Sequence, residues 1–216
     1  NNSLLFSKDI PIIVIAPSKK PQSSSTVGTS VVVLDEEFLK NSNEYFLGDV
    51  LSSGTTSANF FQNGGHGSTS AIQLRGLPKR YSTVYIDGVK MSDPSSVSGD
   101  FDFNHILTSQ ISRVEILKGN QSSVYGSGAI GGTINITTKK GKPGTQTNSM
   151  INTGSHGTVN YSASYSGSDD INNFYVGFER FQTDGISAMT HNDEKDGYKN
   201  NSLVANYSRE LPNNFK

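Results

Sequence analysis

The sequence predicts a small α+β domain followed by antiparallel β-strands, and three observations lead to this fold class. The chain has 22 glycines and only 33% hydrophobic residues, which favours strands and turns over long helices. Between about residues 29 and 140, short helical and strand patterns alternate without the regular period of βαβ units. After residue 141, apolar and polar residues alternate strictly, as in strands that have two different faces.

Composition and charge exclude several classes of function. A net charge of -1 gives no basic surface for phosphates, so we expect no nucleic-acid partner. The chain has no cysteine, which excludes disulfides and thiolate metal sites. No apolar run approaches the roughly 20 residues of a membrane-spanning helix, so this chain can cross a membrane only as a barrel. It begins at Asn1 rather than Met, and we expect processing or truncation to have removed any export signal.

The first 28 residues contain one short apolar run. It is bounded by Pro11 and Pro17, which limit how far a strand can spread, and a polar stretch over residues 18–26 reads as a linker. The run consists of Ile12, Ile13, Val14, Ile15 and Ala16. We therefore predict an isolated strand on a tether.

Residues 29–140 predict several short elements. A strand over residues 30–34 leads to Asp35, which can cap a short helix through Phe38 and Leu39. A second helix after Ser42 is expected to end at Gly54 in a left-handed cap.

Two irregular loops and a hairpin are expected next. Residues 55–70 and 92–104 predict the loops, and Asp87-Gly88 between two short apolar runs predicts a tight two-residue turn. The other expected elements are strands at 72–74, 114–117 and 133–138, and a short helix near 106–111.

Four strands are expected after residue 141, near residues 145–154, 158–166, 173–183 and 200–209. Short turns at 155–157 and 168–170 contrast with a long polar loop over 184–199, as at the two rims of an outer-membrane barrel. A soluble sandwich predicts the same alternation of residues, so periodicity alone leaves both architectures open.

Five motifs in a fixed order resemble the plug domain of TonB-dependent receptors. They lie at residues 48–51 (Gly-Asp-Val-Leu), 73–76 (Gln-Leu-Arg-Gly), 85–89 (Tyr-Ile-Asp-Gly-Val), 112–119 (Ser-Arg-Val-Glu-Ile-Leu-Lys-Gly) and 125–136 (Tyr-Gly-Ser-Gly-Ala-Ile-Gly-Gly-Thr-Ile-Asn-Ile). The resemblance implies a plug that fills a large barrel, whereas four strands cannot close one. The expected fold class is thus an α+β plug domain followed by the first antiparallel strands of a transmembrane β-barrel, in a fragment of a longer gene product.

This resemblance divides the chain into a TonB box and linker (1–28), a plug domain (29–140) and the first barrel strands (141–216). It implies active import across the outer membrane of a Gram-negative bacterium, driven by the C-terminal domain of TonB. The TonB box would be the apolar run at residues 12–16, which could donate a full edge of backbone hydrogen bonds by strand addition. The alternative is an ordinary terminal strand packed on the domain.

The resemblance is nearest to the cobalamin transporters, which implies a corrinoid cargo. The residues that would contact it lie in the two loops and are Asn63, Gly64, Gly65, His66, Thr69, Ala71, Val97 and Ser98. Small residues let backbone amides approach a bulky, rigid ligand. Ferric siderophore and heme receptors of the same family are the alternative, and a secreted or surface β-rich adhesin is the alternative of another class.

Two further sites are implied by the same resemblance. Arg75 and Lys118 would lock the plug to barrel glutamates, and the alternative is a solvated arginine at the end of a strand. Asn192, Glu194 and Asp196 alternate in the long loop and could bind calcium through oxygen ligands, the alternative being a solvated acidic loop.

An enzyme is not expected. Gly126, Gly128 and Gly131 match the spacing of a dinucleotide fingerprint, but a strand rather than a helix is predicted after them and no acid lies near residue 151. The four histidines show no metal-type spacing, so apart from the calcium loop no cofactor is expected.

Overall fold

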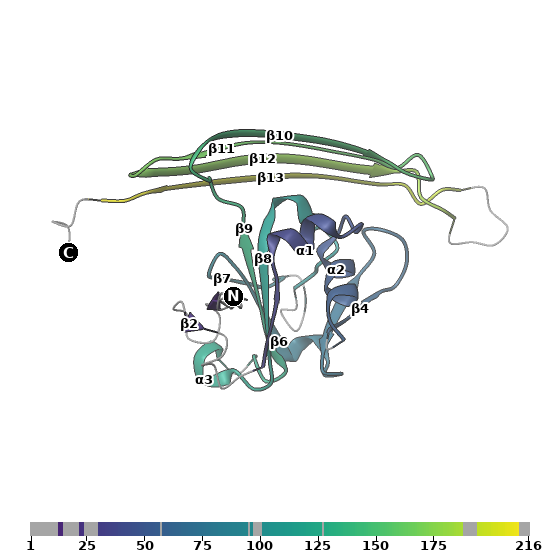
Figure 1. Ribbon diagram of the computed structural model, residues 1–216. Coiled ribbons are helices and arrows are strands. Elements are labelled where there is room, and N and C mark those ends of the chain that lie inside the picture. The colour runs from purple at the N-terminus through teal and green to yellow at the C-terminus, as the bar shows by residue number, and fades with distance from the viewer. Residues whose placement is uncertain are drawn as a thin grey trace, which may run out of the picture.

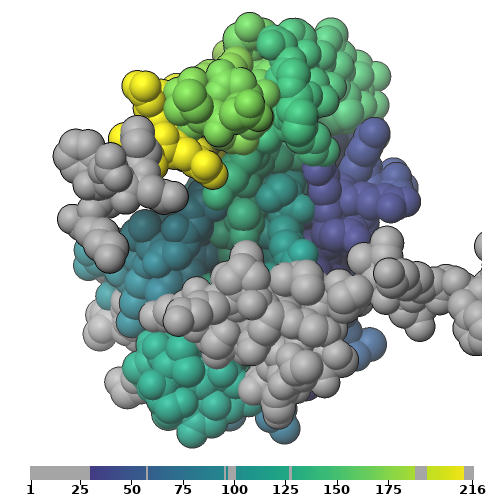
Figure 2. Space-filling view, turned by 60° about the vertical axis from the view of Figure 1, so that its left-hand side comes forward, coloured from purple at the N-terminus to yellow at the C-terminus, as the bar shows by residue number. Residues whose placement is uncertain are grey.

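A computed structural model describes residues 30–56, 58–94, 96, 101–126, 128–187 and 194–211, together with the backbone of two short strands, β1 (Ile13–Val14) and β2 (Gln22–Ser23). The described chain forms two layers (Figure 1). An α+β domain lies against one face of a long, curved, four-stranded sheet. Figure 2 shows the same arrangement in space-filling form, with the sheet in green to yellow above the domain.

The domain is built on a five-stranded sheet with the order β3-β8-β9-β6-β7. Its strands are β3 (Val31–Leu34), β6 (Ser82–Ile86), β7 (Val89–Met91), β8 (Ile111–Lys118) and β9 (Gly132–Thr138). Only the β6–β9 pair is parallel within this sheet; β3, β8 and β9 pair antiparallel, as do β6 and β7. All the strands expected in this region after residue 80 are therefore confirmed, and β8 is longer than the pattern predicted.

The turn between β6 and β7 has the expected chemistry. Asp87 and Gly88 have φ angles of 47° and 84°, the left-handed values that a two-residue hairpin turn requires. The predicted hairpin is confirmed.

Short helices cover the sheet. α1 (Glu36–Asn41) begins where Asp35 accepts a hydrogen bond of 2.9 Å from the backbone N–H of Phe38, as predicted. α3 (Ser122–Tyr125) and the 3-10 turns η2 (Lys79–Tyr81) and η3 (Thr108–Gln110) complete this part. Among the described residues, no helix has the length and apolar character needed to span a membrane.

α2 (Leu47–Gly54) corrects the prediction for Gly54. This glycine is the last helical residue rather than a left-handed cap, and Thr55 follows it in an extended conformation. Glycine suits this position for a different reason: a Cβ would lie 3.1 Å from the side chains of Leu34 and Phe38, closer than ordinary contact. Close packing, not backbone geometry, selects it.

The expected loop over residues 55–70 is wrong in its first half. Residues 58–62 form β4 (Ala58–Gln62), which pairs antiparallel with β5 (Ser70–Leu74). Ala58, Ile72 and Leu74 are buried against α2, so contacts with the core organise a segment that looks polar in the sequence. Likewise, the helix expected near 106–111 is only the three-residue turn η3, after which β8 begins at Ile111.

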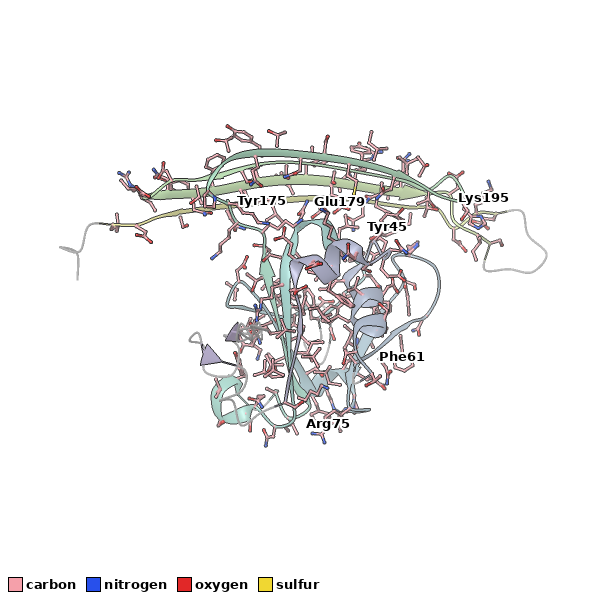
Figure 3. The ribbon with its side chains drawn as sticks, viewed as in Figure 1. Tyr45, Phe61, Arg75, Tyr175, Glu179 and Lys195 are labelled. Carbon is pink, nitrogen blue, oxygen red and sulfur yellow. The ribbon has the colours of Figure 1, made fainter. Side chains whose placement is uncertain are left out.

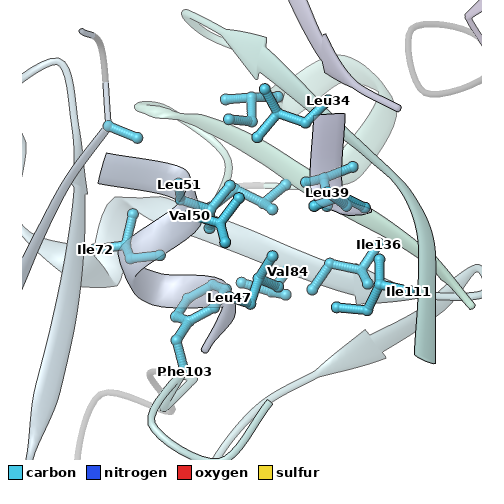
Figure 4. Packing of buried hydrophobic residues seen from close by; sticks show 14 of the residues in the cluster. Leu34, Leu39, Leu47, Val50, Leu51, Ile72, Val84, Phe103, Ile111 and Ile136 are labelled. Carbon is cyan, nitrogen blue, oxygen red and sulfur yellow. The ribbon is translucent and has the colours of Figure 1, made fainter. Parts of the chain in front are cut away.

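A large hydrophobic cluster holds most of these elements together (Figure 4), and a smaller one packs Tyr125 of α3 against Tyr85 and Leu117. α2 contributes Leu47, Val50 and Leu51, each of them fully buried. They pack against Val114 and Ile134 of the central strands. Burying side chains of this size stabilises the domain by about 1.5–3 kcal/mol each.

The second layer is a meander of four antiparallel strands, which we call the wall. It consists of β10 (Gly144–Thr153), β11 (Val159–Ser168), β12 (Asn172–Thr183) and β13 (Tyr198–Arg209), in that order. All four expected strands are confirmed, with bounds shifted by two residues at most. The wall forms an open sheet, so the predicted succession of an α+β domain and unclosed antiparallel strands is confirmed.

Candidate functional site

The two faces of the wall differ in polarity. Along β12, Val176 and Phe178 are exposed on the face away from the domain, whereas Tyr175, Glu179 and Phe181 are buried beneath it. Figure 3 labels Tyr175 and Glu179 along this strand. The other exposed large apolar residues of β11 and β13 are Tyr161, Tyr165, Leu203 and Tyr207. An apolar outer face and a polar inner face are typical of a strand that stands between lipid and a lumen.

Two loops identify one rim of the wall. The backbone N–H of Asp184, which follows β12, donates to the carbonyl oxygen of His156 between β10 and β11 (2.9 Å). The β12–β13 loop and the β10–β11 turn therefore lie together, and we call this end the loop rim. The short turn at Asp169 lies at the other end, the turn rim.

An aromatic cluster joins the domain to the wall near the loop rim. Phe46, at the start of α2, packs edge-on against Phe181 of β12 with ring centroids 4.9 Å apart. His66, in the β4–β5 loop, lies 4.9 Å from the ring of Phe46 and 5.3 Å from that of Phe181. Tyr198 of β13 contacts this group and bonds through its hydroxyl to Nδ1 of His105 (2.8 Å).

His66 is the titratable member of this cluster that belongs to the domain. Loss of solvation lowers its pKa, and the neighbouring carboxylate of Asp49 acts in the opposite direction. The neutral imidazole is thus favoured against the aromatic rings. The cluster holds the β4–β5 loop on the inner face of the wall.

A polar contact lies at the centre of the inner face. The hydroxyl of Ser109, in η3, donates to Oε2 of Glu179, and Nδ2 of Asn160 donates to Oε1 of the same carboxylate (2.9 Å). The neighbouring Gln110 donates to the carbonyl oxygens of Gly177 and Ser202, at 3.3 Å each, and accepts from the Ser202 hydroxyl (3.1 Å). The turn η3 is therefore bonded directly to β12 and β13, and β11 joins through Glu179; we call this set the central dock.

The third contact is made where the chain leaves the domain for the wall. Asn173 of β12 accepts from the backbone N–H of Gly141 (2.9 Å) and donates to its carbonyl oxygen (2.8 Å). A Cβ at residue 141 would clash with the carbonyl oxygen of Gly167, so only glycine fits this crossing. Asn173 thereby fixes the exit segment, which we define as residues 138–141.

A cavity of about 1190 Å³ lies between the domain and the wall. Its domain side carries charges, with Glu36 paired to Lys142 at 2.8 Å and to Lys139 at 4.0 Å. Burial lowers the pKa of Lys139, an effect that Glu36 partly opposes. The wall side is polar and includes Asn148 and Ser162. The lining combines these charged and polar groups with apolar side chains, among them Leu39 and Tyr45.

The predicted cargo residues are partly brought together. Asn63, Gly64, Gly65, His66 and Thr69 share the loop between β4 and β5. Ala71 lies within β5, paired with Phe61, and is half-buried. Val97 and Ser98 fall outside the described residues. Contact with a cargo stays a prediction, although His66 has a place in the aromatic cluster.

The two predicted lock residues are brought together on another side of the domain. Nη1 of Arg75 would lie 3.4 Å from a Cβ on Gly119, the residue after Lys118. Arg75 is exposed, with a φ of 57°, and Figure 3 shows it on the side away from β10–β13. Arg75 therefore does not face these four strands (Figure 3), and the lock stays a prediction.

The coupling strand and the calcium loop are only partly described. Ile13 and Val14 form β1 and pair antiparallel with Ser23 and Gln22, so the strand is not isolated and the linker contributes its partner. Ile12, Ile15 and Ala16 lie outside the described residues, as does Asn192.

Glu194 and Asp196 lie in the β12–β13 loop. Within the described part of the chain, no group of three or more histidines and acids is placed to hold a metal. The calcium site, which also needs Asn192, stays a prediction.

The docking residues Ser109, Gln110 and Asn173 were missed in the sequence. Ser109 and Gln110 look like ordinary polar positions before a strand, and nothing local marks them as partners of residues about 70–90 positions later. Glu179 had one usable signal, because it falls on the face of an alternating strand opposite to Val176 and Phe178.

Comparison with known proteins identifies a family. Residues 23–133, just over half of the chain, match the family model described as "TonB-dependent Receptor Plug Domain". The domain bounds 1–28, 29–140 and 141–216 are wider than this match and stay predictions.

Solved structures share the fold over most of this chain. The siderophore receptor PirA from Acinetobacter baumannii is 20% identical with a TM-score of 0.63, and covers 85% of this chain and 29% of its own. The ferric yersiniabactin uptake receptor FyuA from Yersinia pestis is 23% identical with a TM-score of 0.64, and the match covers 86% of this chain and 29% of that receptor. The ferripyoverdine receptor of Pseudomonas aeruginosa is 17% identical with a TM-score of 0.68, and the match covers 81% of this chain and 23% of that receptor. The chain thus spans less than a third of the length of these receptors.

The central dock yields a testable expectation. Glu179→Ala removes the acceptor of both Ser109 and Asn160 and leaves buried hydroxyl and amide groups unpaired, at a cost of about 1–3 kcal/mol each. In the complete receptor, the guanidinium concentration at which protease first cuts the α+β domain should fall. Phe178→Ala, one residue along β12 on the exposed face, is the control and should leave it unchanged. Equal effects of both variants would contradict the dock.

Proposed function

We propose an import function from one premise: the chain belongs to the family of TonB-dependent receptors and carries their plug domain. Members of this family lie in the outer membrane of Gram-negative bacteria, and so does this protein. They are receptors and transporters rather than enzymes. The function that we propose for the complete protein is active, TonB-driven uptake of a scarce small molecule into the periplasm.

One observation supports this function most directly. The plug is bonded to the inner face of strands whose outer face is apolar, through the central dock and the aromatic cluster. A plug held in this way blocks free diffusion through a barrel and must be rearranged before a cargo can pass. Work on the plug then has to come from a partner that pulls on it, which is the role we assign to TonB.

We assign the coupling role to the segment around β1. TonB would replace β2 as the partner of Ile13 and Val14, because the pairing with Gln22 and Ser23 spans only two residues and is readily exchanged. The alternative is a terminal strand with a structural role only, in which the β1–β2 pairing itself is what matters.

A pair of proline variants separates these roles. Val14→Pro removes an N–H from the coupling strand, so uptake by the complete receptor should be abolished while cargo binding at the cell surface is retained. Gln22→Pro breaks the same β1–β2 pair from the other strand and should leave uptake intact. The measurements are uptake and surface binding of labelled cargo. Normal uptake by Val14→Pro, or equal loss in both variants, would overturn the assignment.

For the cargo we propose a ferric siderophore. The three receptors named above are described as receptors for siderophores or their ferric complexes, and their similarity to this chain supports the iron-chelate alternative over the cobalamin prediction. The support is limited to fold, because the identities are 17–23%. The glycine-rich β4–β5 loop, from which cobalamin was predicted, also suits close backbone contact with a chelate.

A growth assay decides between the two cargoes. The complete gene, in a strain without its own siderophore and cobalamin receptors, should restore growth on a ferric siderophore as the iron source. It should not restore growth that depends on added cobalamin. The opposite pattern would show the cobalamin prediction to be right.

A further inference from the structure

The exit segment is held at a second point, on its other side. Nδ2 of Asn206, on the inner face of β13, donates to Oγ1 of Thr138 (2.7 Å) and to the carbonyl oxygen of Lys139 (2.8 Å). Thr138 is the last residue of β9 and is almost completely buried. A strand of the wall is thus hydrogen-bonded to the end of a central strand of the plug.

The Thr138 hydroxyl also connects to the turn of the β6–β7 hairpin. It donates to Oδ2 of Asp87, while the backbone N–H of Thr138 donates to Oδ1 of the same carboxylate (3.0 Å). The backbone N–H of Asp87 in turn donates to the carbonyl oxygen of Ile136 (2.9 Å). Asp87 therefore closes a ring of hydrogen bonds around the end of β9.

We propose that Asp87 positions the plug on the wall through the Thr138 hydroxyl and Asn206. We call these three residues the relay, and it fixes where the plug's exit segment lies on the wall. The role goes beyond turn formation, because a type I′ turn needs only a residue that tolerates a positive φ. The carboxylate adds two acceptors that point at one threonine. The relay rests on the proposed function, since a fixed position of the exit segment matters only in a plug that must close a barrel.

The chemistry of the relay makes each member identifiable. The Thr138 hydroxyl accepts a hydrogen bond from Asn206 and donates one to Asp87, so the two bonds polarise each other and strengthen together. Asp87 and Asn206 communicate only through Thr138 in this scheme. Their mutational effects should consequently be coupled when residue 138 carries a hydroxyl and independent when it does not.

The experiment uses a thiol reporter in the complete receptor in outer-membrane vesicles. Ser166 of β11 is 5% exposed on the inner face, beside Gly167, which the exit segment crosses. This part of the protein has no cysteine, and any cysteine elsewhere in the complete protein is first replaced. With Ser166→Cys, the rate of labelling by a maleimide reports how often the exit segment leaves the wall.

Asp87→Asn, Thr138→Val and Asn206→Leu should each raise that rate about three- to tenfold, the equivalent of one hydrogen bond. Asparagine keeps the left-handed turn, and valine keeps the shape of threonine. Thr138→Ser, which keeps the hydroxyl, and Asn201→Leu, on the outer face of β13, should leave the rate unchanged. With Thr138 present, the double variant Asp87→Asn/Asn206→Leu should raise the labelling rate by less than the product of the two single effects. In the Thr138→Val background, it should raise the rate by the full product of the single effects measured in that background.

Multiplicative effects in the presence of Thr138, or an unchanged rate in Thr138→Val, would overturn the relay. A variant that only unfolds the domain would raise labelling in both backgrounds alike and would show no coupling. Labelling needs neither cargo nor TonB, so the outcome is independent of the import function. Coupled labelling without any uptake of a ferric siderophore or of cobalamin would refute the proposed function and leave the relay in place.

Discussion

The bond between Ser109 and Glu179 is the contact on which the arrangement of plug and wall depends. A carboxylate in the middle of an inner face is costly unless hydrogen-bond donors surround it. Asn160 supplies one donor from the wall and Ser109 the other from the plug, so both oxygens of Glu179 have a donor only when the plug is present. The polar inner face and the plug are therefore complementary, and neither is a self-sufficient surface.

The contacts on either side of this bond differ in kind. Near the loop rim they are aromatic, through Phe46, His66 and Phe181, and depend on packing. At the exit segment they are hydrogen bonds from Asn173 and Asn206 to the backbone and to Thr138. Directional bonds fix position more strictly than ring packing does. The exit segment is thus held in register more strictly than the part of the domain near the loop rim.

Much of the fold could be predicted from the sequence, because strand alternation and turn residues are local signals. The four wall strands and the Asp87-Gly88 turn were found in this way. β4 was missed because its burial depends on α2, and Gly54 was misread because packing rather than φ selects it. The docking residues could not be predicted, since serine, glutamine and asparagine acquire partners only after distant segments meet. The motif resemblance identified the family but not the cargo.

The most direct test of this account is a cross-linking measurement on the complete receptor in outer membranes. Thiols introduced by Ser109→Cys and Glu179→Cys should be joined by a short bifunctional methanethiosulfonate, because the two native side chains are bonded to each other. Thiols from Ser109→Cys and Phe178→Cys should stay separate, because residue 178 is exposed on the opposite face of the strand. Failure of the first pair, or equal yields from both pairs, would contradict a plug docked on these strands.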